Sequence, residues 1–184
     1  MATEAELVTT ERGLVPKGDG WFVLNARQTQ WWERDGRGAL CEFEGSGFAG
    51  ALDFPQLGIN LTRIGPGEPM SMYHWEADQE DFLVLAGEAL LIIEGEERPL
   101  KQWDFVHCPP GTNHAIVGAG DGPSLILAVG ARDRSTGADW GAYTVDEAAV
   151  RHGAGVEQET TEPSQAYARF GGSELTAYRD EFLP

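Results

Sequence analysis

Two histidines and two glutamates are the side chains in this sequence best suited to chemistry: His74, Glu76, Glu80 and His114. On a β-strand, residues two apart project from the same face, so His74 and Glu76 would point together and Glu80 would return from the following loop. His114 must come from another strand. Imidazole nitrogens and carboxylate oxygens, without a thiolate, suit Fe(II), Mn(II), Zn(II), Ni(II) or Co(II). We therefore predict that these four side chains hold one divalent transition metal.

Glu76 has two alternative roles at such a site. If all four side chains bind the metal, two carboxylates neutralise the charge of a divalent ion, and the site becomes a weaker Lewis acid that favours harder metals. Alternatively, Glu76 stays off the metal and accepts a proton from the substrate as a general base. A third interpretation is a domain that retains these residues without holding a metal.

Short β-strands must position these side chains. The alternating apolar residues from Leu57 to Ile64 predict a half-buried strand, and the glycines and proline at 65–67 predict the turn that ends it. Met70 and Met72 share the parity of His74, so we predict that they belong to the next strand and give the site an apolar approach. Further strands are expected at Trp21–Leu24, Phe82–Leu85, Ala89–Ile93, Arg98–Lys101, Asp104–Cys108, His114–Gly118 and Ser124–Val129.

This succession of short strands and turns predicts an all-β fold, either a sandwich or a closed barrel. We expect an N-terminal arm with an aromatic-rich segment over residues 1–55, a barrel core over 56–130, and a C-terminal extension over 131–184. In the extension, Thr144–Glu147 fits a capping box that starts a short helix, and Pro163 is expected to start a second one.

Two segments resemble the sequence motifs of the cupin superfamily. The first motif pairs two histidines, one residue apart, with a later glutamate and a glycine. His74, Glu80 and Gly87 match it, with Glu76 in place of the second histidine. The second motif runs from a glycine-aspartate pair through a proline-glycine turn to a histidine, and residues 103–114 match it with a tryptophan in place of the first glycine.

The resemblance covers roughly residues 56–130, and Gly118 stands where the second motif often has an asparagine. It implies a cupin-type β-barrel, a double-stranded β-helix or jelly roll, of the kind found in small single-domain bacterial cupins. It also implies a metal on the four residues named above, and a homodimer. The resemblance does not fix the activity, because cupins include dioxygenases, isomerases, decarboxylases, sugar-binding regulators and storage proteins.

We expect a metal-dependent enzyme of the oxygenase type that acts on a small organic molecule inside the barrel. The alternative from another class is a binding or sensing protein, in which the metal orients a carboxylate or a sugar and no bond is broken. A metal-dependent isomerase or epimerase with Glu76 as base is a third hypothesis. The inward-facing positions Met70, Met72, Phe82 and Ile116 indicate only a partly apolar cavity, so the substrate stays open.

Composition limits which binding partners and which cellular compartment we expect. With 30 acidic and 13 basic residues the formal charge is −17, which disfavours nucleic acid and anionic membranes as partners. No apolar stretch has the length that crosses a bilayer, so we expect a soluble cytoplasmic protein. Cys41 and Cys108 are too few for a disulfide framework and are expected to be free thiols. His107 and Cys108 would face opposite sides of a strand, so we expect no nucleophilic pair there.

Overall fold

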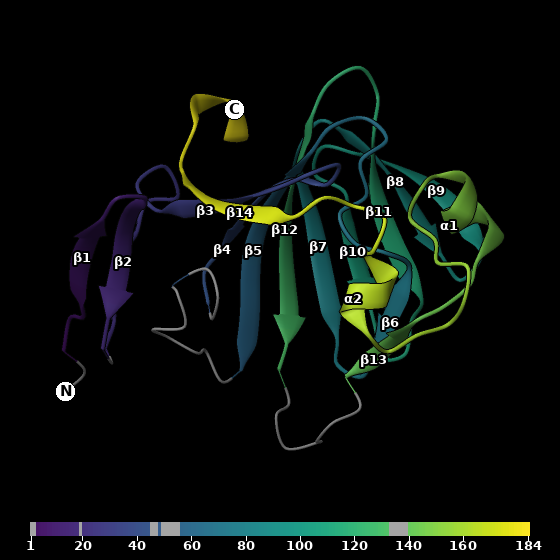
Figure 1. The fold of residues 1–184 in the computed structure, drawn as a ribbon, viewed down its shortest axis with the longest axis horizontal. Coiled ribbons are helices and arrows are strands. Elements are labelled where there is room, and N and C mark those ends of the chain that lie inside the picture. Colours follow the sequence, from purple (N-terminus) through teal and green to yellow (C-terminus); the bar gives the residue numbers. More distant parts are fainter. Residues whose placement is uncertain (1–2, 19, 45–47, 49–55, 133–139) are drawn as a thin grey trace.

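The computed structural model describes residues 3–18, 20–44, 48, 56–132 and 140–184. The described chain is mostly β, and its strands form two large sheets and one small one (Figure 1). The expected boundary near residue 55 between the N-terminal segment and the barrel core lies outside the described residues. No helix within the described ranges is both long and apolar enough to cross a bilayer.

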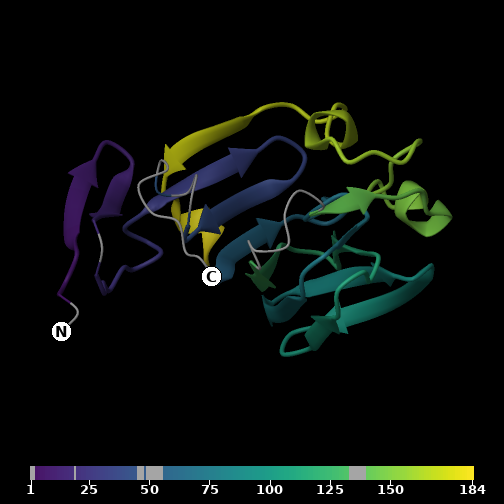
Figure 2. The same cartoon turned by 90° about the horizontal axis from the view of Figure 1, so that it is seen from below.

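The two large sheets are built from antiparallel strand pairs. The seven-stranded sheet has the order β10 (Phe105–Cys108), β7 (Glu80–Ala86), β12 (Ser124–Ala131), β5 (Leu57–Ile64), β4 (Gly38–Glu42), β3 (Gln30–Arg34) and β14 (Ser173–Ala177). The five-stranded sheet has the order β13 (Gly141–Tyr143), β6 (His74–Glu76), β11 (His114–Ala119), β8 (Glu88–Ile93) and β9 (Glu96–Lys101). Figure 2 shows strands of one sheet lying across from strands of the other.

The main hydrophobic core lies between these two sheets. Its buried side chains come from β5, β7, β10 and β12 on one side and from β8 and β11 on the other: Ile64, Phe82, Ala89, Leu91, Val106, Cys108, Ile116, Ile126 and Ala128. Phe82 and Ile116 face inward, as predicted from the sequence. Alternation along each strand places one set of side chains in the core and the other outside, so the all-β sandwich prediction is confirmed.

A close backbone crossing explains the glycine at position 118. A Cβ atom there would collide with the carbonyl oxygen of Gly65, because the turn after β5 lies directly against β11. The Gly67 amide donates to the Gly118 carbonyl at 2.8 Å, and the Gly118 amide donates to the Glu68 carbonyl at 3.0 Å. An asparagine, which is often found at this position of the motif, would not fit this crossing.

The chain that leads into β6 is not the continuous strand predicted for residues 70–76. Only the last three residues form a strand, and the Tyr73 amide donates to the Ala154 carbonyl at 2.7 Å. Met72 is fully buried, but it packs with aromatic and apolar residues of the C-terminal extension instead of the sandwich core. Partners distant in sequence therefore set the backbone here, which local alternation could not reveal.

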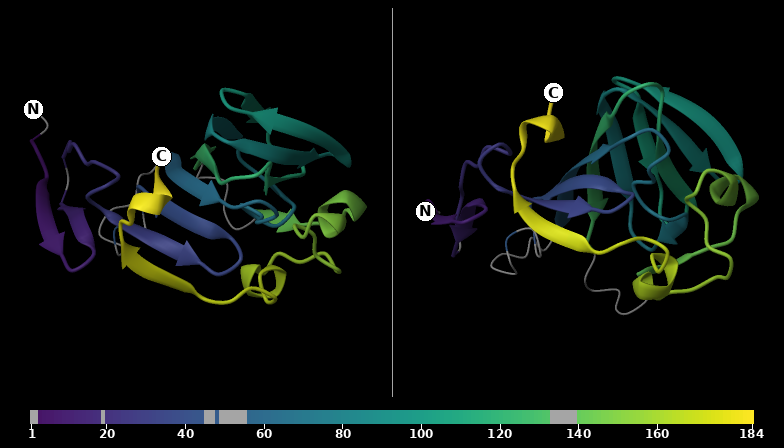
Figure 3. Two further views of the ribbon diagram at one scale, coloured as in Figure 1. Left: turned by 90° about the horizontal axis from the view of Figure 1, so that it is seen from above. Right: turned by 45° about the horizontal axis from the view of Figure 1, so that its top comes forward.

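The N-terminal arm also differs from the prediction. The strand predicted at Trp21–Leu24 is absent from the described residues, where Trp21 forms only an isolated bridge with Glu4. Instead, β1 (Glu6–Thr10) and β2 (Gly13–Lys17) form a hairpin that stands at one end of the molecule (Figure 3). The following segment supplies β3 and β4, which pair with each other and extend the seven-stranded sheet. β3 also pairs with β14, which comes from a distant part of the chain.

Short helices in the C-terminal extension confirm the prediction of one or two helices. The first, α1 (Glu147–Arg151), is capped by Asp146, whose carboxylate accepts a hydrogen bond from the Ala149 amide at 2.8 Å. The cap is thus two residues later than the Thr144 expected for a capping box. The second, α2 (Pro163–Ala166), begins at the predicted proline, and a 3-10 turn η2 (Asp180–Phe182) lies near the end of the chain.

Candidate metal centre

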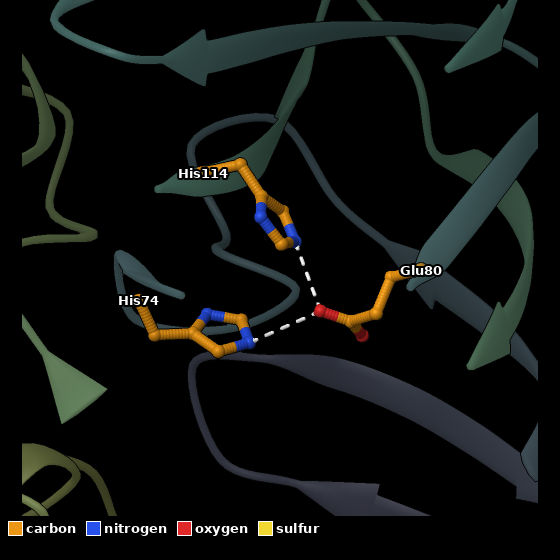
Figure 4. A group of neighbouring side chains, drawn as sticks. All are labelled: His74, Glu80 and His114. Carbon is orange, nitrogen blue, oxygen red and sulfur yellow. Dashed lines mark ion pairs between the residues drawn. The ribbon is translucent and has the colours of Figure 1, made fainter. Parts of the chain in front are cut away.

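Three of the four predicted ligands meet between the two large sheets. His74 begins β6 and His114 begins β11, and their Cα atoms are paired across these neighbouring strands. Glu80 begins β7 in the opposite sheet and projects toward both imidazole rings (Figure 4). The strand ends therefore bring residues 74, 80 and 114 together, as the sequence spacing had suggested.

The donor atoms of these side chains converge on one another. Oε2 of Glu80 lies 3.3 Å from Nε2 of His114 and 3.6 Å from Nε2 of His74. One ligand atom from each of the three residues can be chosen so that all lie within 4.8 Å of one another. The two imidazole centroids are 4.9 Å apart, so both rings present their Nε2 edge to the same carboxylate (Figure 4).

Backbone carbonyls hold both imidazoles in the orientation that a metal ligand needs. Nδ1 of His74 lies 2.7 Å from the Met72 carbonyl oxygen, and Nδ1 of His114 lies 3.0 Å from the Thr112 carbonyl oxygen. A carbonyl oxygen can only accept, so each Nδ1 must carry hydrogen and donate it. In its neutral form each ring then has its Nε2 lone pair directed toward Glu80, and this tautomer is the one that binds metals in such sites.

The site contains buried polar atoms that lack partners. His74 and His114 are 6% and 1% exposed, and the Glu80 side chain is 15% exposed. Among the described residues, Oε2 of Glu80 and Nε2 of His114 are buried and make no hydrogen bond. Leaving such atoms unpaired is costly, and one divalent cation between them would satisfy both. The donor set therefore fits a transition metal.

The electrostatics of the site favours positive charge at the same place. Burial lowers the pKa of His74, but Glu76 and Glu80 outweigh it and raise that pKa to about 9. Burial likewise lowers the pKa of His114, while Cys108 and Glu80 raise it to about 9. Burial raises the pKa of Glu80, and the two histidines lower it to about 2. The carboxylates that favour a proton on each Nε2 also favour a metal cation there.

Glu76 lies at the margin of this centre. Its Oε1 is 3.7 Å from Nε2 of His74, but Glu76 is not part of the three-residue group whose donor atoms converge. Its Oε2 is 3.9 Å from Nη1 of Arg132, and its side chain is 23% exposed. Glu76 therefore lies between the candidate ligand His74 and the cation Arg132, outside the group of three converging donors.

Sequence reasoning missed two further residues at this centre. Arg132 follows β12 and reaches Glu76 from a distant part of the chain, so no local signal marks it. Cys108 pairs with Glu80 across β10 and β7, faces the core, and acts on the pKa of His114. Strand alternation could have found it, because the parity that turns His107 outward turns Cys108 inward.

Aromatic side chains form a wall around the two imidazoles. The ring centroids of Tyr143 and Trp140 lie 5.8 and 6.3 Å from that of His74, and the Phe82 ring lies 5.3 Å from that of His114. Tyr143 and Trp140 belong to the C-terminal extension, outside the segment that carries the two sequence motifs. The extension thus contributes directly to the surroundings of the candidate ligands.

Comparison with known families settles the class of fold. The cupin-domain family matches residues 60–130, the segment that holds the ligand motifs and most of the sandwich. This chain contains a cupin domain. Its two sheets form the double-stranded β-helix of cupins. The resemblance to cupins that the two sequence motifs indicated is therefore confirmed. The search of curated proteins gave no match for this cupin.

Several solved structures are similar to part of this chain. A proposed sugar phosphate isomerase from Acidithiobacillus ferrooxidans is 29% identical, with a TM-score of 0.42, over 47% of this chain and 54% of its own. A Cupin 2 conserved barrel domain protein from Salinispora arenicola is 28% identical, with a TM-score of 0.40, over 45% and 66%. An RmlC-like cupin from Methanocaldococcus jannaschii is 19% identical, with a TM-score of 0.42, over 46% and 78%. The match spans about half the length of the first of these proteins.

Proposed function

We propose that this cupin domain binds one divalent transition metal through His74, Glu80 and His114 and acts on a small organic molecule next to it. The convergence of two Nε2 atoms and one carboxylate oxygen, with both Nδ1 atoms held by backbone carbonyls, carries the proposal. Two histidines and one carboxylate leave coordination positions open, and this donor set is typical of non-haem iron oxygenases. An oxygenase with Fe(II) or Mn(II) is therefore the leading function, although Zn(II) and Ni(II) suit the same donors.

The residues around the site have different roles. The Met72 and Thr112 carbonyls keep the imidazoles in their ligating tautomer, and the aromatic wall of Phe82, Trp140 and Tyr143 offers an apolar contact surface to a substrate. A bound metal would supply Lewis acidity and, if it is iron or manganese, redox chemistry. Glu76 can accept or hold a proton at its carboxylate.

The position of Glu76 favours a second candidate function. A carboxylate that lies beside the ligands without joining them is suited to remove a proton from a substrate that is held at the metal. We therefore keep a metal-dependent isomerase or epimerase as the alternative enzyme. A binding or sensing cupin would use the same three ligands without turnover. For each of these functions we propose a small-molecule partner and a cytoplasmic location.

Elemental analysis tests the metal site directly. The full chain is purified without chelator or added metal, as the unaltered protein and as His74→Ala, His114→Ala and His107→Ala. His107 is the matched control, because it lies on the outside and pairs with Asp81 at 2.7 Å. We expect about one transition metal per chain in the unaltered protein and in His107→Ala, and loss from the other two variants. An unaltered protein that is empty and cannot be loaded would refute the proposal.

Oxygen dependence then separates the two enzyme functions. An oxygenase consumes dioxygen with its substrate after loading with iron, whereas an isomerase converts its substrate without oxygen and fails in Glu76→Gln while the metal content persists. Binding of a metabolite by the loaded protein, with neither oxygen uptake nor product, would leave the binding or sensing function instead.

A further inference from the structure

Arg132 reaches the candidate metal centre from just beyond the end of β12. Its Nε lies 3.4 Å from Oε1 of Glu44, and its Nη1 lies 3.9 Å from Oε2 of Glu76. The Arg132 amide donates to the Gln56 carbonyl at 2.9 Å, and Nη1 donates to the Ala131 carbonyl at 3.0 Å. The guanidinium is thus anchored by its own backbone and lies between two carboxylates, one of which borders the ligand His74.

A pair of glycines makes room for this guanidinium. Gly58 of β5 and Gly130 of β12 are paired across the seven-stranded sheet, and Gly130 is also paired with the ligand Glu80. A Cβ atom at Gly58 would collide with Nη2 of Arg132 and with Oε1 of its partner Glu44, and one at Gly130 would lie 2.6 Å from Nη1 of Arg132. The guanidinium therefore occupies the space beside Glu80 where two side chains of this cross-strand row would otherwise project.

The charges at this place decide what the guanidinium can do. With His74, Glu80 and His114 as ligands, a divalent metal keeps one positive charge, and that charge would attract Glu76 into the ligand set. Arg132 attracts the same carboxylate from the other side. A guanidinium cannot lose its proton in a protein, so Arg132 is a permanent positive charge beside this carboxylate.

We infer that Arg132 is a positioning residue that holds Glu76 outside the ligand set of the metal. The metal then keeps three protein ligands, and Glu76 remains a free carboxylate beside them. This inference rests on the proposed metal site and deepens it, because it places Glu76 outside the ligand set. It also explains the glycine pair, since a Cβ atom at either position would occupy space that the guanidinium fills.

Metal affinity tests the inference without any assay of turnover. The dissociation constant for Zn(II) and for Mn(II) is measured on the full chain by competition with a chromophoric chelator. In Arg132→Ala, Glu76 is released and joins the metal, so we expect binding to tighten by on the order of tenfold. Arg132→Lys, which keeps the charge, should stay near the unaltered value. Arg98→Ala is the matched control, because Arg98 is exposed and pairs with Glu96 at 2.6 Å on the edge strand β9.

Two further variants separate position from charge. Gly58→Ala keeps every charge but displaces the guanidinium, whose end is flexible enough to move, so it should also tighten binding. In a Glu76→Gln background, Arg132→Ala should have no effect, because no carboxylate remains to be released. If the tightening survives in that background, the effect is one of simple charge and the inference is wrong.

The remaining outcomes are equally decisive. Weaker or unchanged binding in folded Arg132→Ala, with Gly58→Ala also unchanged, would overturn the inference while leaving the three-ligand site intact. Circular dichroism and a melting curve establish that each variant is folded, and Gly58→Ala provides the test if Arg132→Ala is not. Absence of metal binding in the unaltered chain would instead refute the proposed function, and the inference with it.

Discussion

Metal loading should stabilise this protein, and His114→Ala should abolish that effect. Two atoms of the site, Oε2 of Glu80 and Nε2 of His114, are buried without a hydrogen-bond partner in the described structure. A bound divalent cation pairs with both of them. Because the unfolded chain has no preformed site, the binding free energy adds to the free energy of unfolding.

The size of the effect follows from these two atoms. An unsatisfied buried polar atom costs about 1–3 kcal/mol, so satisfying two of them returns about 2–6 kcal/mol. Mass action gives a similar figure, since free metal at about 100 times its dissociation constant stabilises by about 2.7 kcal/mol. For a chain of this length each kcal/mol raises Tm by about 2–4 °C, so we expect a rise of about 5–10 °C.

Thermal melts of chelator-stripped protein, with and without Mn(II), Fe(II), Zn(II) or Ni(II), measure this shift. Each variant is compared with its own metal-free melt, which removes the packing cost of the substitution itself. His107→Ala lies outside the centre and should keep the full shift. The reasoning fails if no metal raises Tm in the unaltered chain, or if His114→Ala shows the same rise.

Three further predictions concern the rest of the molecule. On the outer face of the seven-stranded sheet, cross-strand pairing sets Leu83 between Phe105 and Leu127, and Phe105 is 63% exposed. We propose that a second copy of the chain covers this row. Light scattering should then show that Phe105→Asp converts a dimer to a monomer, whereas Val145→Asp stays dimeric. An unaltered chain that is monomeric would refute this proposal. Burial raises the pKa of the Cys41 thiol to about 12, so it should react with a thiol reagent only after denaturation, and modification of Cys41 in the native protein would contradict its burial. Gly118→Ala should lower the free energy of unfolding by about 2 kcal/mol or more in chemical denaturation, because its Cβ meets the Gly65 carbonyl, and a neutral effect would show that the crossing can relax.

The convergence of the three candidate ligands could be predicted because their positions depend on local rules. His74 begins the short strand β6, Glu80 begins the next strand after a short connection, and His114 begins a strand after a proline-glycine turn. The strands β8 and β12 were likewise predicted within two residues at their ends, because their apolar runs are bounded by turn residues.

The remaining features depend on partners that are distant in the chain. The irregular backbone before β6 is fixed by a hydrogen bond from the Tyr73 amide to the Ala154 carbonyl. The sequence near either residue does not indicate this contact. The contact between Glu76 and Arg132 likewise joins β6 to a residue beyond β12. Tertiary pairing overrides local periodicity at such places, and here they lie next to the candidate centre.

The C-terminal extension is therefore part of the candidate site, although it lies outside residues 60–130, the segment that matches the cupin family. β13 pairs with β6 and sets Tyr143 directly opposite His74, so a ligand on a strand of only three residues is held from both sides. Trp140 adds a second ring to the same wall. The barrel thus supplies the candidate ligands, while the extension supplies aromatic rings beside them. If the proposed function is correct, substitutions at Trp140 and Tyr143 should change which small molecule binds while the metal content stays the same.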